Sequence, residues 1–262
     1  METVTSKDGT TIAFDRTGEG PTLVVVGGAL NGRTDAAPLA ALLSPSFTVI
    51  AYDRRGRGDS TDTQPYAVER EIEDLAAVIK VTGGSAFAFG HSSGAALILE
   101  SAARGLPIMK QALYEPPYIV DDSRPPLPKE YVDHLDELVA SDRRGEAVEY
   151  FMTVAVGMPP EMVTPMRDAP MWKSLEDIAH TIAYDGRMMG DHMSGAPLPS
   201  DWSSIDVPTL VMDGGASPAW QRNAVRELAE LLPNAERRTL DGQTHVAAPE
   251  VLAPVLEEFF SG

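Results

Sequence analysis

A serine between two glycines stands in the pentapeptide GHSSG at residues 90–94, which fits the pattern G-x-S-x-G. The compact apolar run at 85–90 predicts a strand before it, and the helix formers at 95–100 predict a helix after it. In this pattern the serine occupies a strained strand-to-helix turn with its hydroxyl exposed above a sheet. We therefore predict that Ser92 is a nucleophile and that the N–H of Ser93, at a helix N-terminus, faces developing negative charge.

Serine is also a favoured N-cap, so Ser92 could merely begin a helix. A general base in the right position would distinguish a nucleophile from such a cap. Of five histidines, only His245 follows a late predicted strand, 236–240, just before the last helix. In nucleophile-elbow enzymes the chain order is serine, acid, histidine, which puts the base at that place. We therefore predict that Ser92 and His245 act together.

The elements that must position these residues alternate between strand and helix. A hairpin is expected over 4–14, and the remaining expected strands are 22–26, 47–51, 85–90, 111–114, 208–212 and 236–240. The expected helices between them are 36–43, 67–82, 95–100, 218–232 and 249–260. This order predicts an α/β fold with a doubly wound, mostly parallel sheet. Residues 119–203 instead read as short helices broken by proline and glycine, so we expect a helical cap (lid) inserted into a core of residues 1–118 and 204–262.

The glycine-rich turn at 27–32 follows the expected strand 22–26 and admits two interpretations. Asp53 lies about 20 residues further on, as in a dinucleotide-binding fingerprint, but Ala29 stands where that fingerprint needs its middle glycine. The alternative is that the turn points the backbone N–H of Ala29 at the site above the sheet. Together with the N–H of Ser93 it would form an oxyanion hole, and this is the interpretation we favour.

Taken together, four segments resemble the α/β-hydrolase superfamily. They are the pentapeptide at 90–94, the turn Gly27-Gly28, the segment Asp53-x-Arg55-Gly56-x-Gly58-x-Ser60 and the segment Gly242-x-x-His245. The resemblance covers nearly the whole chain, with 119–203 as the variable cap. It implies a serine hydrolase with a triad of serine, histidine and an acid.

The third member of that triad is not at the family's usual position. The resemblance places an aspartate a few residues past the strand 208–212, where this chain has Ser217. Two carboxylates could replace it: Glu115, between a strand and two prolines, and Asp213, at the end of the strand itself. We predict that Glu115 is the acid, because a carboxylate held there is rigid, and we keep Asp213 as the alternative.

Composition limits the partners. The chain of 262 residues carries 39 acidic and 21 basic residues, a net charge of −18. This charge argues against nucleic acid and anionic membrane surfaces, which attract positive patches. There is no cysteine, no secretory signal and no apolar stretch of about 20 residues, so we expect a cytoplasmic protein. We expect no metal, because no two histidines have metal-ligand spacing, and no other cofactor; the oligomeric state is not predicted.

The expected cap is rich in methionine, with eight of the chain's eleven. Methionine is over-used on adaptable apolar binding surfaces, although packing between cap helices would need the same residues. We therefore expect an apolar small molecule as the partner. The residues expected to bind it are Gly28, Leu30, His91, Met152, Met188 and Trp172.

These residues predict a serine hydrolase that cleaves an ester, thioester or lactone through an acyl-enzyme. One alternative keeps the same serine and histidine for a cyclase or lyase reaction with water excluded. A third possibility is a binding protein without turnover, against which the intact pair of Ser92 and His245 argues.

Overall fold

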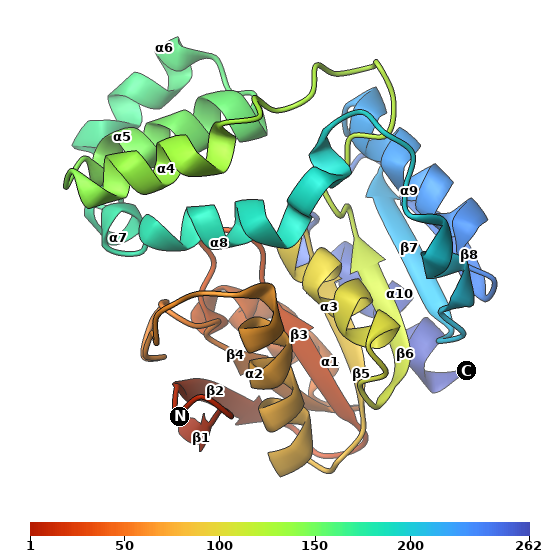
Figure 1. Cartoon of the computed structure of the whole chain (residues 1–262). Helices are drawn as coiled ribbons and strands as arrows, with labels where there is room; N and C mark the ends of the chain where they lie inside the picture. Colours follow the sequence, from red (N-terminus) through yellow and green to blue (C-terminus); the bar gives the residue numbers. More distant parts are fainter.

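An eight-stranded sheet runs through the computed structural model, which describes residues 1–262 (Figure 1). The strands are β1 (Glu2–Thr5), β2 (Thr11–Thr17), β3 (Thr22–Val26), β4 (Thr48–Tyr52), β5 (Ala86–His91), β6 (Ile108–Tyr114), β7 (Thr209–Gly214) and β8 (Ala235–Leu240). Their order across the sheet is β1-β2-β4-β3-β5-β6-β7-β8. Strand β2 is antiparallel to both of its neighbours, and all strands from β4 to β8 across the sheet are parallel. The predicted α/β fold with a mostly parallel sheet is confirmed.

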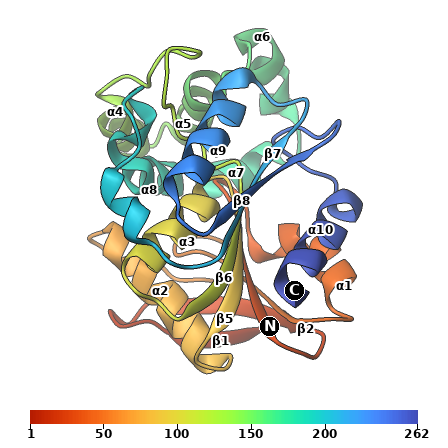
Figure 2. The same cartoon turned by 90° about the vertical axis from the view of Figure 1, so that its right-hand side faces the viewer.

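Helices cover both faces of this sheet (Figure 2). The covering helices are α1 (Ala37–Leu43), α2 (Val68–Val81), α3 (Ser93–Ala103), α9 (Ala219–Leu231) and α10 (Pro249–Ser261). Helices α2, α3 and α9 pack on one face and share a cluster of 34 buried apolar residues, whereas α1 and α10 pack together over a cluster of 17 on the other. Strand β3 explains the division, because Val24 and Val26 enter the first cluster and Leu23 and Val25 the second. Alternate residues of a strand face opposite sides, so a strand buried on both faces is apolar throughout.

The segment between β6 and β7 forms a second layer of helices over the carboxyl ends of the central strands (Figure 1). These helices are α4 (Tyr131–Ala140), α5 (Arg144–Tyr150), α6 (Pro160–Val163), α7 (Trp172–Asp177) and α8 (His180–Met189). A π-helical stretch, Phe151–Val156, follows α5, and 3-10 turns lie at Arg33–Ala36, Thr164–Asp168, Gly190–Met193 and Ser200–Ser204. This layer has its own cluster of eleven buried apolar residues, and α8 packs against α2 and α3. None of the helices combines the length and apolar character that crossing a bilayer demands.

Candidate active site

The turn between β5 and α3 holds Ser92 in a conformation that L-residues rarely adopt, with φ 56° and ψ −125°. The surrounding glycines leave the space that this turn needs. A Cβ atom on Gly90 would lie 2.6 Å from the backbone of Ala95, and one on Gly94 would lie 2.3 Å from the carbonyl oxygen of Val26. Strain of this kind persists only where the surroundings enforce it and is common at functional sites. The strand-to-helix turn therefore presents Ser92 above the carboxyl edge of the sheet.

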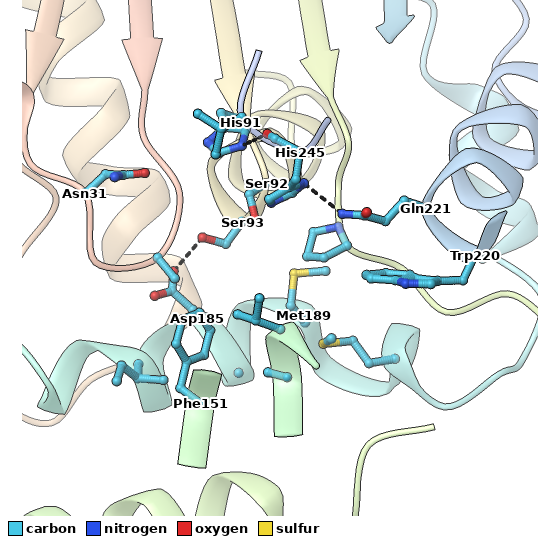
Figure 3. A pocket seen from close by; sticks show the side chains of 18 of the residues that line it. Asn31, His91, Ser92, Ser93, Phe151, Asp185, Met189, Trp220, Gln221 and His245 are labelled. Carbon is cyan, nitrogen blue, oxygen red and sulfur yellow. Dashed lines mark hydrogen bonds between the residues drawn. The ribbon is translucent and has the colours of Figure 1, made fainter. Parts of the chain in front are cut away.

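His245 lies in the loop between β8 and α10 and lines the same cavity as Ser92 (Figure 3). Its backbone carbonyl accepts a hydrogen bond of 2.8 Å from Nε2 of His91, and the two imidazole rings lie 4.7 Å apart. Burial and the nearby ring of His245 lower the pKa of His91 to about 4. His91 is therefore neutral at pH 7, and its ring ties the loop that carries His245 to the elbow.

Glu115 meets the imidazole of His245 from the end of β6. Its Oε2 lies 2.8 Å from His245 Nδ1, and its Oε1 accepts a hydrogen bond of 2.7 Å from the N–H of Gly214. The side chain is fully buried, and the backbone of Glu115 has a φ of 45°. An ionised carboxylate is acceptor-only, so it favours the tautomer with the proton on Nδ1. That tautomer leaves Nε2 free to act as a base.

Asp213 does not fit the alternative assignment as the acid that orients His245. It is fully buried in β7, but its Oδ2 lies 2.8 Å from Arg237 and 3.4 Å from Arg222. Its Oδ1 accepts a hydrogen bond of 2.7 Å from Thr239. Its partners thus come from β8 and α9, and the carboxylate is fully occupied as a structural ion pair.

Gln221, from the first turn of α9, is a neighbour of His245 that the sequence did not suggest. Its Nε2 lies 2.8 Å from the same Nδ1 atom that Glu115 contacts (Figure 3). An imidazole nitrogen cannot donate to Glu115 and accept from Gln221 at once. If Nδ1 accepted a hydrogen bond from Gln221, the ring proton would be on Nε2, and Nε2 could then not act as a base. Nothing in the sequence distinguishes this glutamine from other polar helix residues, because its contact is with a residue 24 positions away.

The two N–H groups expected to bind an oxyanion lie at this cavity. Ala29 and Ser93 both line it, and neither N–H group donates to an acceptor within the protein. Ser93 is the first residue of α3, where N–H groups have no partner inside the helix. A Cβ atom on Gly28 would lie 2.9 Å from the Cβ of Ser92, so the glycine allows this loop to approach the elbow.

The cavity above Ser92 has a volume of about 480 Å³. Half of its 22 lining residues are hydrophobic. The layer of helices above the sheet contributes apolar side chains that include Phe151, Ile182, Met189 and Met193. Trp220 of α9 lies beside Met189 in the lining (Figure 3). A concave apolar site with a few converging polar groups is typical of small-molecule binding.

Several residues expected to bind substrate do not line this cavity. The prediction is wrong for Met152, Met188 and Trp172, which are buried in the packing between helices and against the core. The indole of Trp172 points instead to Glu176, its hydrogen-bond partner at 3.1 Å. Leu30 packs under the same helices, and Gly28 supports the elbow from outside the lining; of the six, His91 alone is part of the wall. Packing fills most apolar helix positions, and the methionine count cannot tell the wall from the interior.

A buried carboxylate, Asp185 of α8, was also missed and lines the cavity. It contacts the hydroxyl of Ser93 and two buried arginines, Arg54 and Arg57, each at 2.7 Å. Burial alone would raise the pKa of Asp185, but the two arginines and the hydroxyl hold it below the ordinary value. The sequence did carry a signal, because an acid at 185 interrupts the buried apolar face of the helix.

The chain is similar to known proteins in sequence and in structure. The model of the Alpha/beta hydrolase family matches residues 23–255. A crystal structure of an alpha/beta hydrolase from Sphaerobacter thermophilus DSM 20745 is 60% identical, with a TM-score of 0.92 over 99% of this chain and 100% of that one. The non-heme chloroperoxidase CPO-A1 of Kitasatospora aureofaciens is 26% identical over 94% of this chain and 92% of the relative.

A more distant structure shares the fold. The enol-lactonase from Burkholderia xenovorans LB400 is 21% identical, with a TM-score of 0.73 over the full length of both chains. The resemblance inferred from the motifs is therefore confirmed by sequence and by structure.

Proposed function

Because the chain belongs to the α/β-hydrolase family, we propose that it is a serine hydrolase that cleaves an ester, thioester or lactone of an apolar small molecule. The observation that carries this proposal is the 2.8 Å contact between His245 Nδ1 and the buried Glu115, on a histidine that shares its cavity with Ser92. A carboxylate on Nδ1 orients the ring and stabilises the imidazolium that forms when Nε2 takes a proton.

Acylation would begin with attack of Ser92 Oγ on the substrate carbonyl while His245 Nε2 accepts the hydroxyl proton. The carbonyl oxygen gains negative charge and is held by the N–H groups of Ala29 and Ser93. Collapse of the tetrahedral intermediate breaks the bond to the leaving group, which takes the proton from His245. Water then attacks the acyl-enzyme with the same base, releasing the acid and regenerating Ser92.

The apolar wall supports an apolar acyl or alcohol group. Side chains such as Met189 and Phe151 offer surface to bury rather than charge to pair. The net charge of −18 adds a repulsive field for anions approaching the protein. We therefore propose a neutral substrate that approaches past α8 and α9, with no cofactor needed for the chemistry.

A second candidate function rests on the relative named a non-heme chloroperoxidase. An acyl-enzyme can be attacked by hydrogen peroxide in place of water, which yields a peracid and free Ser92. The peracid would then oxidise halide outside the protein. The same residues would serve both reactions, so the nucleophile that is supplied distinguishes them.

The test of the proposal is covalent labelling by a fluorophosphonate together with hydrolysis of p-nitrophenyl esters and lactones. Ser92→Ala should abolish labelling and lower turnover by about 10⁶-fold, as removal of a triad nucleophile does. Ser101→Ala is the matched control, because this hydroxyl only returns to the carbonyl of Leu97 within α3. Labelling of Ser92→Ala at full stoichiometry would overturn the assignment.

The same measurements separate the alternatives. Labelling without hydrolysis of any ester would favour the cyclase or lyase reaction. Absence of both labelling and hydrolysis would favour a binding protein. Faster consumption of ester when hydrogen peroxide is added, with oxidation of bromide, would favour the peracid reaction.

A further inference from the structure

Two arginines follow β4 at the positions that the resemblance leaves variable. In the segment Asp53-x-Arg55-Gly56-x-Gly58, Arg54 and Arg57 are the variable residues, and their side chains are only 2% and 1% exposed. Buried guanidinium groups must find acceptors, because desolvating an unpaired charge is costly. Arg54 has Glu71 as a bidentate partner, at 2.6 and 2.8 Å. Arg57 has one carboxylate partner, Asp185.

Asp185 joins these arginines to the elbow. Its Oδ1 accepts from Arg54 Nη1 and from the hydroxyl of Ser93, and its Oδ2 accepts from Arg57 Nη2, all at 2.7 Å. Figure 3 shows the carboxylate reaching from α8 toward Ser93, across the cavity from the catalytic histidine. Asp185, from the helices above the sheet, therefore lies at the centre of a network whose other members belong to the core.

The network ends on the peptide that carries one oxyanion donor. Arg57 Nη1 donates to the carbonyl oxygen of Gly28 at 2.6 Å. The C=O of Gly28 and the N–H of Ala29 belong to the same planar, trans peptide unit, so they point in opposite directions. Fixing the carbonyl on Arg57 thus turns the N–H of Ala29 toward the cavity.

The second donor is anchored by the same carboxylate. The Ser93 hydroxyl donates to Asp185 and accepts from Arg54 Nη1 at 3.0 Å, so the side chain of the residue is locked from two sides. The backbone N–H of Ser93 stays free at the start of α3. The direction of the Ala29 N–H is therefore held through Arg57, and the side chain beside the second donor is anchored to the same Asp185.

We propose that Asp185 and Arg57 are positioning residues of the oxyanion hole, so that the hole is complete only while α8 is docked on the core. The inference rests on the proposed serine hydrolase and adds a role for the helices above the sheet. Arg54 keeps Glu71 when α8 moves away, whereas Arg57 loses its only carboxylate partner. The Ala29 donor is therefore the one that depends most on docking.

The test compares Asp185→Asn and Arg57→Met with Asp136→Asn as the matched control. Asp136 pairs with Arg187 on the side of α8 that contacts α4, so its loss breaks a partly exposed aspartate–arginine ion pair that lies outside the cavity. We expect kcat to fall about 10- to 100-fold in the first two variants with KM changed less than threefold, because an oxyanion donor acts in the transition state. The affinity for a boronic acid, which forms a tetrahedral adduct, should fall by the same factor.

Hydrogen exchange of the Asn31 N–H, which donates to the same carbonyl oxygen of Gly28 at 3.3 Å, provides a readout that needs no turnover. It should be faster in Asp185→Asn and Arg57→Met than in the wild type and in Asp136→Asn. If Asp185→Asn does not fold, Ser93→Ala removes one hydroxyl of the network, keeps the backbone N–H, and should show the same split between kcat and KM.

The outcomes distinguish the two proposals. Wild-type protein that hydrolyses no ester and takes no fluorophosphonate overturns the proposed function, and hydrogen exchange still decides whether the network anchors Ala29. Exchange and kcat within twofold of Asp136→Asn would overturn the positioning role. So would a raised KM with unchanged kcat, since that result would mean that Asp185 contacts the substrate.

Discussion

The cavity has two walls that are built in different ways. On the core wall, His91, and Glu115 behind the wall, are fixed by hydrogen bonds to backbone groups 154 and 99 residues away in the chain. On the opposite wall, side chains such as Phe151, Ile182 and Met189 are held by packing alone. Directed hydrogen bonds fix an atom to a fraction of an ångström, whereas an unbranched side chain such as that of Met189 can repack. Under the proposed function, the first wall would therefore carry out the chemistry and the second would select the substrate.

Asp185 is the exception on the second wall, since it is charged, buried and hydrogen-bonded to the first. The other side chains of this wall are expected only to select the substrate. The two walls are therefore not independent, and the substitutions below measure how far each can be changed alone.

The largest effect should come from Glu115, after β6, in contrast to Asp213 in β7. Glu115→Gln should lower kcat about 10⁴-fold, because an amide at His245 Nδ1 no longer favours the reactive tautomer. Asp213→Asn should leave kcat within a few-fold and lower the free energy of unfolding by about 1–3 kcal/mol, because it weakens the buried pair with Arg237. Steady-state kinetics and thermal unfolding of both variants check the contrast.

If Asp213→Asn loses most of its kcat and Glu115→Gln keeps its own, Asp213 is the acid and Glu115 is structural. If kcat is unchanged in both variants, Ser92 and His245 work as a pair without an acid. The fixed hydrogen bonds of the core wall would then matter little for turnover.

Much of the core wall could be predicted from the sequence, because its residues come from patterns that are local. The elbow at Ser92 needs glycines on both sides within five residues, and His245 follows a strand that its own residues predict. The two prolines that follow Glu115 favour it over Asp213, because they hold it rigid. The partners of Asp213 come from β8 and α9, which no local pattern reports.

The opposite wall could not be predicted at the level of residues. Its composition indicated an apolar site, but Met152 and Met189 have the same chemistry and only packing between helices decides which one faces the cavity. The contacts of Asp185 with Arg57 join residues 128 positions apart. The acid stands out on the apolar face of α8, but its partners depend on how α8 docks on the core, which no local pattern reports.

The second prediction concerns the apolar wall. Across p-nitrophenyl esters from acetate upward, kcat/KM should rise about fourfold per carbon until the cavity is full, because each buried methylene contributes about 0.8 kcal/mol. Met189→Ala should change this slope and leave the rate of fluorophosphonate labelling within about twofold. Val251→Ala, on the exposed side of α10, is the control.

A flat series, or the best rate with acetate, would mean that the methionines serve only to pack helices. A strong loss of labelling in Met189→Ala would break the comparison differently, by showing that the apolar wall also positions the reacting groups.

The last prediction concerns folding stability below pH 7 and tests His91, which ties the loop of His245 to the elbow. Its pKa is lowered to about 4 by burial and by His245, whereas an unfolded histidine titrates near 6.5. Between these values the unfolded chain binds the additional proton, so stability is lost as the pH falls from about 6.5 to about 4, by at most about 1.4 kcal/mol per pH unit. His91→Gln keeps a donor for the carbonyl of His245 and should flatten this part of the curve, which denaturant unfolding at a series of pH values measures. His134→Gln, at a half-buried position on α4 outside the cavity, is the control. If the curves of His91→Gln and the wild type run parallel from pH 7 to pH 4, protonation of His91 does not destabilise the fold. The loop of His245 would then be held by the backbone and not by a neutral His91.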